Sequence, residues 1–307
     1  MRAALEVLAR QRGAVAALQL AGGPHPELQP AAVVQPDRSQ RLGLQAPDWD
    51  GTKTCAEVHV LATPNREETW AYLALARRAG GRVFLCAENR LGADGWRKKL
   101  KPLDSFSQSH CRLMELDPAS LPEQGNPLEL RLPYPGADFV SCPGLFSWDR
   151  FDPGSQLLLE FASPQMPGRG ADLGCGPGLL ARQLLSRGCQ QLDLVDVDQR
   201  AVQAAWLNCS QDARCRPLWL DLVQEKPPGG YDWVTLNPPF HGSGQEDRAL
   251  GLALLARAAG ALRKAGTLWM VANEHLPYQE GLAHLNLELL EVRQQRGYKL
   301  FQCRKNA

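Results

Sequence analysis

The chain has 307 residues, enough for two domains of ordinary size and a substantial buried core. Apolar residues make up 44% and charged residues 22%, as in soluble globular proteins, and no run approaches the roughly 20 apolar residues of a membrane span. The net charge of +1 lacks the basic excess typical of nucleic-acid-binding proteins. The nine cysteines form no CxxC pair, which predicts reduced thiols in a cytoplasmic protein and no metal site.

The first half of the chain contains one strand–helix–strand unit. The strand EVHVL, residues 57–61, is followed by the proline turn ATPN, a helical stretch rich in Ala and Leu, the strand RVFLC and a polar turn. The basic cluster WRKKLK, residues 96–101, comes next, and most such clusters form a solvated surface.

A proline-rich stretch, residues 116–143, divides the chain. Its composition is typical of a connector, with room for a short hairpin through LELRL and DFVSC. We therefore place a domain boundary there, with residues 1–133 as the first domain and 134–307 as the second.

Strands and helices alternate through the second half. The predicted strands are GADLGC, QLDLVDVD, RPLWLD, YDWVTLN and TLWMVANE, and the predicted helices are LLARQLLSRG, QRAVQAAWLNCS and EDRALGLALLARAAGALRKAG. This alternation predicts an α/β fold in which helices cover both faces of a mainly parallel sheet. The final segment, LELLEVRQQRGYKLFQCRK, predicts an antiparallel hairpin around Gly297, which completes a sheet of seven strands.

The two halves repeat the same order of elements. ATPN follows a strand in the first half as LNPP does in the second, and CAEN corresponds in the same way to VANE. We predict a duplicated domain, although any two strand–helix–strand units share some likeness. The first copy has no glycine-rich loop like DLGCGPG, so we expect it to have lost its ligand site.

The segment ADLGCGPG, residues 171–178, joins a strand to a helix through a glycine-rich turn. Glycines permit positive φ and close approach of the backbone to a ligand. The carboxyl end of the first strand of an open α/β sheet is where a nucleotide-like ligand binds. The residues that we expect to bind it here are Asp172, Gly174, Cys175, Gly176 and Gly178.

Acids end the next two strands. Asp196 follows the loop by about 20 residues, where an acid can hold ribose hydroxyls. Asp221 ends the third strand, where it could meet an adenine amino group. We expect their neighbours Val197 and Leu222 to border the same ligand.

Two prolines end the fourth strand. Because proline donates no ladder hydrogen bond and fixes its own φ, the strand YDWVTL must stop at Asn237, and Pro238 and Pro239 stiffen the turn that follows. Asn237 therefore lies at the same sheet edge as the glycine loop and the two acids.

This combination resembles the S-adenosylmethionine-dependent methyltransferases, and NPPF resembles the motif of those that methylate exocyclic amino groups. The resemblance implies that Asn237 borders the cofactor and that its side-chain oxygen, with the Pro238 carbonyl, accepts the two N–H bonds of the target amino group. That arrangement localises the nitrogen lone pair toward the methyl donor. The resemblance also implies that Pro239 keeps both acceptors in place and that Phe240 stacks on the base.

Longer stretches resemble the bacterial ribosomal RNA guanine-N2 methyltransferase family, which acts on 16S rRNA or, in a paralogous branch, 23S rRNA. They are PGLFSWDRFDPGSQLLLE, VANEHLPYQEGL and NPPFH, with a looser match in AENRLGADGWRKKL. This resemblance implies two Rossmann-like methyltransferase domains, of which the first is degenerate and non-catalytic. It implies a cofactor, S-adenosylmethionine, a partner, ribosomal RNA or the small ribosomal subunit, and substrate contacts from Phe240, His241 and Asn273.

The expected reaction is methylation of a guanine N2 in ribosomal RNA, with 16S rRNA as the expected substrate, in a protein with no membrane or metal partner. The alternatives are the 23S branch, a methyltransferase for DNA adenine or protein glutamine, and an RNA-binding protein without activity. DNA adenine and glutamine enzymes use the same Asn-Pro-Pro-aromatic motif, often with Tyr. The intact DLGCGPG and NPPF segments argue against an inactive protein.

Overall fold

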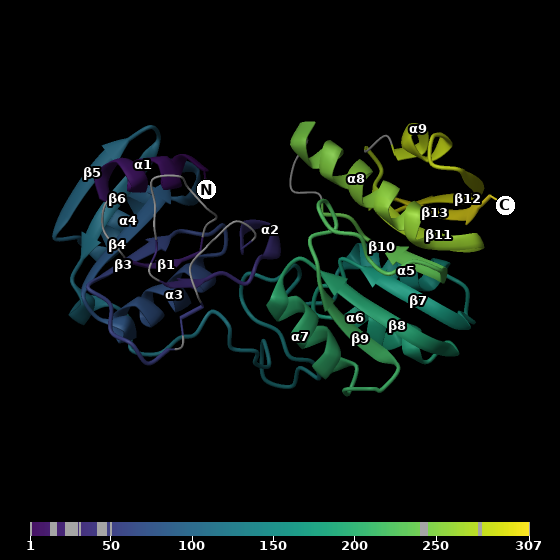
Figure 1. Cartoon of the computed structure of the whole chain (residues 1–307), viewed down its shortest axis with the longest axis horizontal. Coiled ribbons are helices and arrows are strands. Elements are labelled where there is room, and N and C mark those ends of the chain that lie inside the picture. The colour runs from purple at the N-terminus through teal and green to yellow at the C-terminus, as the bar shows by residue number, and fades with distance from the viewer. Residues whose placement is uncertain are drawn as a thin grey trace. The chain divides into compact units, whose positions relative to one another are not determined.

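The computed structural model describes residues 2–12, 17–21, 30, 32–41, 48–49, 51–239, 245–275 and 278–306. The chain forms two compact units (Figure 1). The first comprises Met1–Arg131 and Cys142–Gly144, and the second comprises Leu132–Ser141 and Leu145–Ala307. The boundary expected after residue 133 lies two residues beyond Arg131, within the segment Leu132–Ser141 of the second unit.

The first unit is built on a six-stranded sheet in the order β2-β1-β3-β4-β6-β5. Strands β1 to β4 are parallel, and β5 and β6 form an antiparallel hairpin at one edge. The strands are β1 Leu18–Leu20, β2 Ala32–Val34, β3 Glu57–Leu61, β4 Arg82–Glu88, β5 Asp104–Gln108 and β6 Cys111–Leu116. The helices are α1 Arg2–Arg12, α2 Arg38–Arg41, α3 Arg66–Ala79, α4 Ala93–Leu100 and the short 3₁₀ turns η1 Asn89–Leu91 and η2 Pro118–Ser120.

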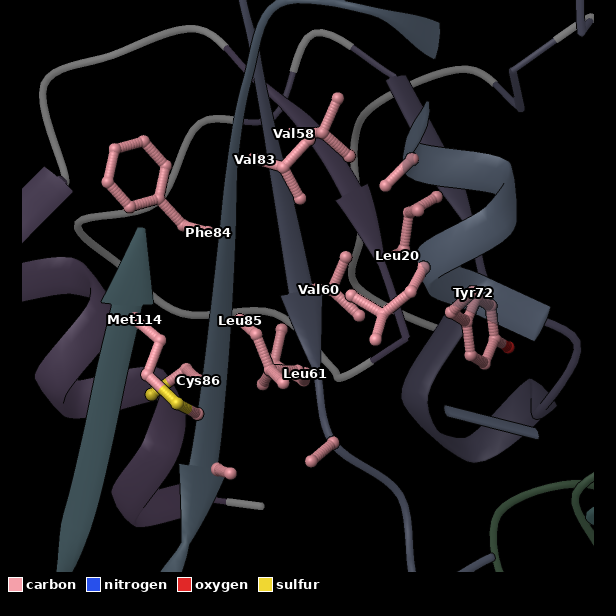
Figure 2. Close-up of a cluster of buried hydrophobic side chains, with 14 of the residues drawn as sticks. Leu20, Val58, Val60, Leu61, Tyr72, Val83, Phe84, Leu85, Cys86 and Met114 are labelled. Carbon is pink, nitrogen blue, oxygen red and sulfur yellow. The ribbon is translucent and has the colours of Figure 1, made fainter. Parts of the chain in front are cut away.

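The core of the first unit lies between its sheet and the helices that pack on it, α1, α3 and α4. Val58, Val60 and Leu85 of the central strands are fully buried, and Tyr72 of α3 packs beside them (Figure 2). Helix α3 is capped by Asn65, whose side chain accepts a hydrogen bond from the Glu68 backbone N–H.

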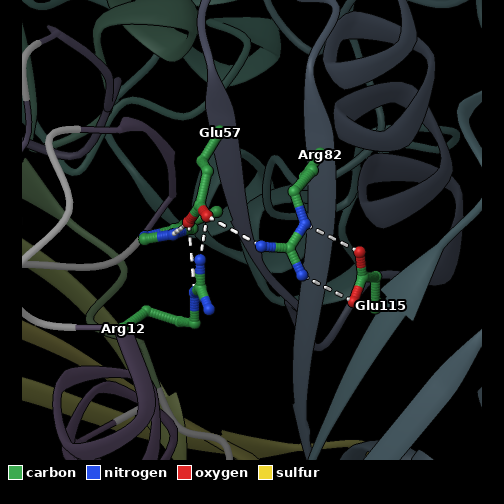
Figure 3. A network of polar contacts seen from close by, with 5 residues as sticks. Arg12, Glu57, Arg82 and Glu115 are labelled. Atoms are coloured by element: carbon green, nitrogen blue, oxygen red, sulfur yellow. Dashed lines mark hydrogen bonds and ion pairs between the residues drawn. The ribbon is translucent and has the colours of Figure 1, made fainter.

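A polar network fixes helix α1 to this sheet (Figure 3). Glu57 of β3 is buried and accepts hydrogen bonds from Arg12 of α1, while Arg82 of β4 pairs with Glu115 at 2.9 Å. The His59 ring lies 3.1 Å from Glu57, and burial followed by the nearby Arg12 charge lowers the pKa of His59 to about 4. The ring is therefore neutral at pH 7, and the guanidinium groups balance the buried carboxylate.

The second unit contains a seven-stranded sheet in the order β12-β13-β11-β10-β7-β8-β9. Five strands are parallel, and β13 runs antiparallel between β11 and β12. The strands are β7 Gly168–Leu173, β8 Cys189–Asp196, β9 Cys215–Trp219, β10 Tyr231–Leu236, β11 Leu262–Asn273, β12 Leu287–Gln295 and β13 Tyr298–Lys305. The helices are α5 Pro153–Phe161, α6 Leu179–Leu185, α7 Gln199–Asn208, α8 Gln245–Ala261 and α9 Tyr278–Ala283.

The two sheets share one topology, which confirms the predicted fold. The order β2-β1-β3-β4-β6-β5 of the first corresponds strand by strand to β8-β7-β10-β11-β13-β12 of the second. An isolated parallel bridge between Val33 and Asp48 lies outside β2, where β9 lies in the second sheet. The turns ATPN and LNPP follow the corresponding strands β3 and β10, as the sequence comparison expected.

Two local predictions were wrong. The hairpin expected through LELRL and DFVSC does not form, because residues 121–152 contain only single bridge positions and five prolines that cannot donate ladder hydrogen bonds. Helix α8 ends at Ala261 rather than near Gly266, because Leu262 already pairs with Tyr231 of β10 and Ala265 has φ 60°, which a helix excludes. In the described part of the chain, no helix is both long and apolar enough to span a bilayer.

Candidate active site

A glycine loop connects β7 to α6 at the carboxyl end of the central parallel strands. Gly174, Gly176 and Gly178 have φ of 77°, 51° and 78°, a region that favours glycine. A Cβ at Gly178 would lie 2.5 Å from the Cα of Ala205, so this glycine also lets the loop pack on helix α7. A Cβ at Gly176 would meet no atom within 4 Å, so the backbone there is open to a ligand.

Asp172 lies just before this loop and carries an open acceptor. Its side chain is buried, Oδ1 accepts a hydrogen bond from Thr235 Oγ1 at 2.8 Å, and Oδ2 has no partner among the described residues. Burial raises the pKa of Asp172 to about 7, against the opposing effect of the Thr235 hydrogen bond. A buried carboxyl with an unfilled oxygen is suited to a cationic or N–H-bearing ligand group.

Asp196 supports the loop from the end of β8. Its Oδ2 accepts from the Gly176 N–H and its Oδ1 from the Asp198 N–H, each at 2.9 Å. These two bonds fix the orientation of the carboxylate beside the loop. The neighbouring Val197 carbonyl accepts from Trp219 Nε1 at 2.8 Å, which ties the ends of β8 and β9 together.

Asp198, the other acid after β8, has a structural task. It caps helix α7 by accepting from the Arg200 N–H, and its carboxylate pairs with the Arg200 guanidinium at 2.6 Å. Since Arg200 is buried, this ion pair holds both side chains, and Asp196 is left as the acid that faces the loop.

Asp221 is engaged within its own turn. The carboxylate accepts from the Val223 N–H at 2.9 Å and from Gln224 Nε2 at 2.7 Å. The next carbonyl, that of Leu222, accepts from Arg257 Nε of helix α8 at 2.7 Å. This segment is therefore rigid before any ligand arrives.

Asn237 presents a single open oxygen at the end of β10. Its Nδ2 donates to Asp152 Oδ2 at 2.9 Å and to Ser155 Oγ at 3.0 Å. Because a carboxylate only accepts, the nitrogen must face Asp152, and this settles which way the amide points. Asn237 Oδ1 is buried and has no hydrogen-bond partner among the described residues.

One cleft brings part of the predicted site together. Asp172, Asn237 and the first residues of the glycine loop line it, and the far wall comes from the segment before α5 and its first turn: Phe146, Ser147, Arg150, Phe151, Asp152 and Ser155. Asp196, Val197, Asp221 and Leu222 lie further along the strand ends and do not line this cleft.

The remaining predicted residues are placed as follows. Pro238 is buried and Pro239 half-buried directly after β10, while Phe240 and His241 lie outside the described residues. Asn273 ends β11, and its side-chain oxygen accepts from the His275 N–H at 3.1 Å, so it shapes a turn.

Sequence reasoning missed Asp152 and Ser155. Their segment, DPGSQLLLE, carries an N-cap signal, since Asp precedes a proline at the first helical position and an apolar run. That signal predicts the start of a helix, but it does not predict a contact with Asn237, 85 residues away.

The class of protein follows from comparison with known families. Residues 136–302 match the family model of the methyltransferase small domain. This span contains the glycine loop, the strand-end acids Asp196 and Asp221, and Asn237. The second unit therefore belongs to this class of methyltransferases.

The relatives narrow the class. The ribosomal RNA small subunit methyltransferase C of Pseudomonas entomophila is 36% identical over 235 residues, which are 72% of this chain and 70% of the relative. Its counterpart in Pseudomonas syringae pv. syringae is 31% identical over 279 residues, 86% of this chain and 82% of that protein. The chain belongs to the ribosomal RNA small subunit methyltransferase C family, which confirms the predicted family.

A solved structure shares the whole fold. The 16S rRNA N2 methyltransferase of T. thermophilus, in complex with AdoMet and guanosine, matches with a TM-score of 0.77 and covers 98% of this chain and 91% of its own. At 22% sequence identity this likeness concerns the fold, and it extends over both units.

Proposed function

We propose that this protein transfers a methyl group from S-adenosylmethionine to the exocyclic N2 of a guanine in 16S rRNA, in the cytoplasm. The observation that carries the proposal is the buried Asn237 Oδ1, an acceptor without a partner among the described residues, beside a glycine loop. The relatives' names indicate the small-subunit rRNA, and the T. thermophilus enzyme is named for an N2 position.

The residues of the cleft fit the methyl donor. When bound, S-adenosylmethionine supplies an electrophilic methyl group on a positively charged sulfur. The open oxygen of Asp172 suits the ammonium of its amino-acid part, and the bare backbone at Gly176 allows close approach. We assign the ribose hydroxyls to Asp196, and the adenine to the strand ends with Val197, Asp221 and Leu222. Gly174, Cys175 and Gly178 shape the loop.

Asn237 and Pro238 then act on the target amino group. Two N–H bonds donated to Asn237 Oδ1 and to the Pro238 carbonyl turn the nitrogen lone pair out of conjugation with the ring. Pro239 limits movement of both acceptors, so they need no reorganisation as the reaction proceeds. Phe240 is assigned to stacking on the base and His241 and Asn273 to substrate contacts. This chemistry requires no ionised general base.

The first unit is proposed to be non-catalytic and to hold RNA, within domain limits of 1–133 and 134–307. The exposed cations of α4, Arg97, Lys98 and Lys99, provide a surface for phosphates. The alternative substrates, DNA adenine and protein glutamine, share the Asn-Pro-Pro motif, but the relatives favour rRNA.

A direct assay tests the reaction. The purified protein, radiolabelled S-adenosylmethionine and small subunits from cells lacking this protein should give label in 16S rRNA, recovered as N2-methylguanosine by mass spectrometry. Large subunits and duplex DNA serve as controls. Label in 23S rRNA or in adenine would show that the substrate is not the proposed one. The absence of label from every substrate would favour an RNA-binding protein without activity.

A further inference from the structure

We propose that Asp152 and Ser155 are positioning residues that lock the Asn237 amide with its oxygen toward the target amino group. This inference rests on the proposed function and deepens it. It concerns the N-cap residue of helix α5 and one side chain of its first turn, in a segment remote in sequence from the NPPF motif.

The contacts form a closed arrangement. Asp152 Oδ2 accepts from Asn237 Nδ2 at 2.9 Å and from the Ser155 N–H at 2.7 Å, and Ser155 Oγ lies 3.0 Å from the same Nδ2. Asp152 is only 8% exposed, so water competes little for these bonds. Both amide protons of Asn237 thus have acceptors, and both come from the first turn of one helix.

The carboxylate makes the arrangement directional. If the amide rotated by half a turn, Oδ1 would face Asp152 Oδ2, and two acceptors would meet without a proton between them. The wrong orientation also turns Nδ2, a donor, toward an amino group that offers only N–H bonds for recognition. Asp152 therefore excludes the orientation in which Asn237 would present a donor instead of an acceptor to the target amino group.

The charge has a second effect. A hydrogen bond from Nδ2 to a carboxylate draws electron density through the amide toward Oδ1, because linked hydrogen bonds polarise one another. Asn237 Oδ1 then becomes a stronger acceptor without placing a negative charge against the base. The proposal accordingly predicts an effect on turnover rather than on binding.

A purely structural role must be separated from this one, because Asp152 is also the N-cap of α5. Asn caps helices as well as Asp, so Asp152→Asn keeps the cap while removing the charge and the acceptor-only constraint. Ser155→Ala removes one acceptor and leaves the helix intact. The matched controls are Asp117→Asn, at the cap of η2, and Ser163→Ala, just after α5, both away from the cleft.

The experiment measures kcat and KM with small subunits, S-adenosylmethionine affinity by calorimetry, and Tm. A charge-assisted hydrogen bond corresponds to about 10- to 150-fold, so Asp152→Asn should lower kcat by about that factor, and Ser155→Ala, which removes a neutral bond, by about 2- to 12-fold. KM, cofactor affinity and Tm should match those of the controls. An unchanged kcat overturns the proposal, as does a loss that tracks Tm or cofactor affinity.

A double variant distinguishes this proposal from the proposed function. In an Asn237→Ala background, Asp152→Asn should add no further loss, since its effect passes through the amide. If the two losses multiply, Asp152 acts by another route and the inference is wrong. If Asn237→Ala alone keeps full turnover, the acceptor role assigned to Asn237 is wrong, whereas the proposed function itself fails only if the wild type leaves 16S rRNA unlabelled.

Discussion

The turns after β3 and β10 occupy equivalent places in two similar sheets, yet their asparagines form different hydrogen bonds. Asn65, in ATPN, accepts a hydrogen bond from the Glu68 N–H and spends its oxygen on the cap of α3. Asn237, in LNPP, has its nitrogen held by Asp152 and Ser155, and its oxygen stays open. The same fold and the same residue type therefore do not by themselves produce an open acceptor at this turn. A second element, here the start of α5, must bind the amide nitrogen and leave the oxygen available.

The largest effect should come from exchanging this acceptor. Asn237→Ala should lower kcat by about 10²–10³ with cofactor affinity nearly intact, because one pre-organised polar partner of the reacting group is lost. Asn65→Ala, the matched change, should leave kcat unaltered and destabilise the first unit by about 1 kcal/mol through its lost cap. Single-turnover kinetics and thermal unfolding measure the two. Equal losses of turnover in both variants would contradict the comparison.

Asp196→Ala should come second. Removing a charge-assisted hydrogen bond to ribose and the support of the Gly176 N–H should weaken S-adenosylmethionine binding by about 10- to 150-fold. The control is Asp212→Ala, which breaks a surface pair with Arg214. Calorimetry should find the control like the wild type; an unchanged affinity in Asp196→Ala would remove this residue from the site.

Asp172 should make the affinity of the second unit for S-adenosylmethionine depend on pH. Its pKa of about 7 means that the carboxyl becomes charged between pH 6 and pH 8. A cofactor ammonium favours the charged form, so affinity should rise with pH, by about tenfold across that window. Asp172→Asn should abolish the rise. A dissociation constant that follows pH equally in both proteins would contradict this assignment.

The same group should affect stability in the opposite sense. The folded pKa, about 7, lies above the unfolded value, so the folded state binds more protons between about pH 4 and pH 7. Relative to Asp172→Asn, the free energy of unfolding of the ligand-free wild type should therefore fall as pH rises through this window, by at most about 1.4 kcal/mol per pH unit. His59, whose pKa is lowered to about 4, adds a rise with pH that is common to both proteins. Denaturant titrations of the wild type and Asp172→Asn across this window should show the difference between the two stabilities shrinking as pH rises.

The smallest effect is expected in the first unit. Neutralising Arg97, Lys98 and Lys99 should weaken RNA binding and lower the slope of log K against log salt by up to about 0.9 per lost phosphate contact. Arg131→Gln, at a 58% exposed position of the same unit, is the control. An unaltered salt slope would mean that α4 only faces solvent.

Much of this arrangement could be predicted from the sequence. Strand–helix alternation, the positions of the two prolines and the glycine spacing each depend on neighbouring residues, so β7, β10 and the loop between β7 and α6 fell where expected. The tasks of the acids could not be separated in this way. Asp198 pairs with Arg200, and Asp221 with its own turn, whereas Asp196 reaches back to Gly176, and only the fold decides among them.

The contact between Asn237 and Asp152 could not be predicted from the sequence for a further reason. It joins segments 85 residues apart, and Asp152 already has a sufficient local explanation as a helix cap. The sequence pattern around Asp152 indicates its local role as a helix cap, but it does not indicate the long-range hydrogen bond to Asn237.

The proline after Asn237 also bears on how long the protein lasts. Asparagine ages chiefly when the backbone nitrogen of the next residue attacks the side-chain amide, and this nitrogen in Pro238 carries no hydrogen and is closed in a ring. The residue on which turnover is proposed to depend is thus shielded from conversion to aspartate. Asn65 is followed by Arg66 and has no such shield, so prolonged storage should convert that position first.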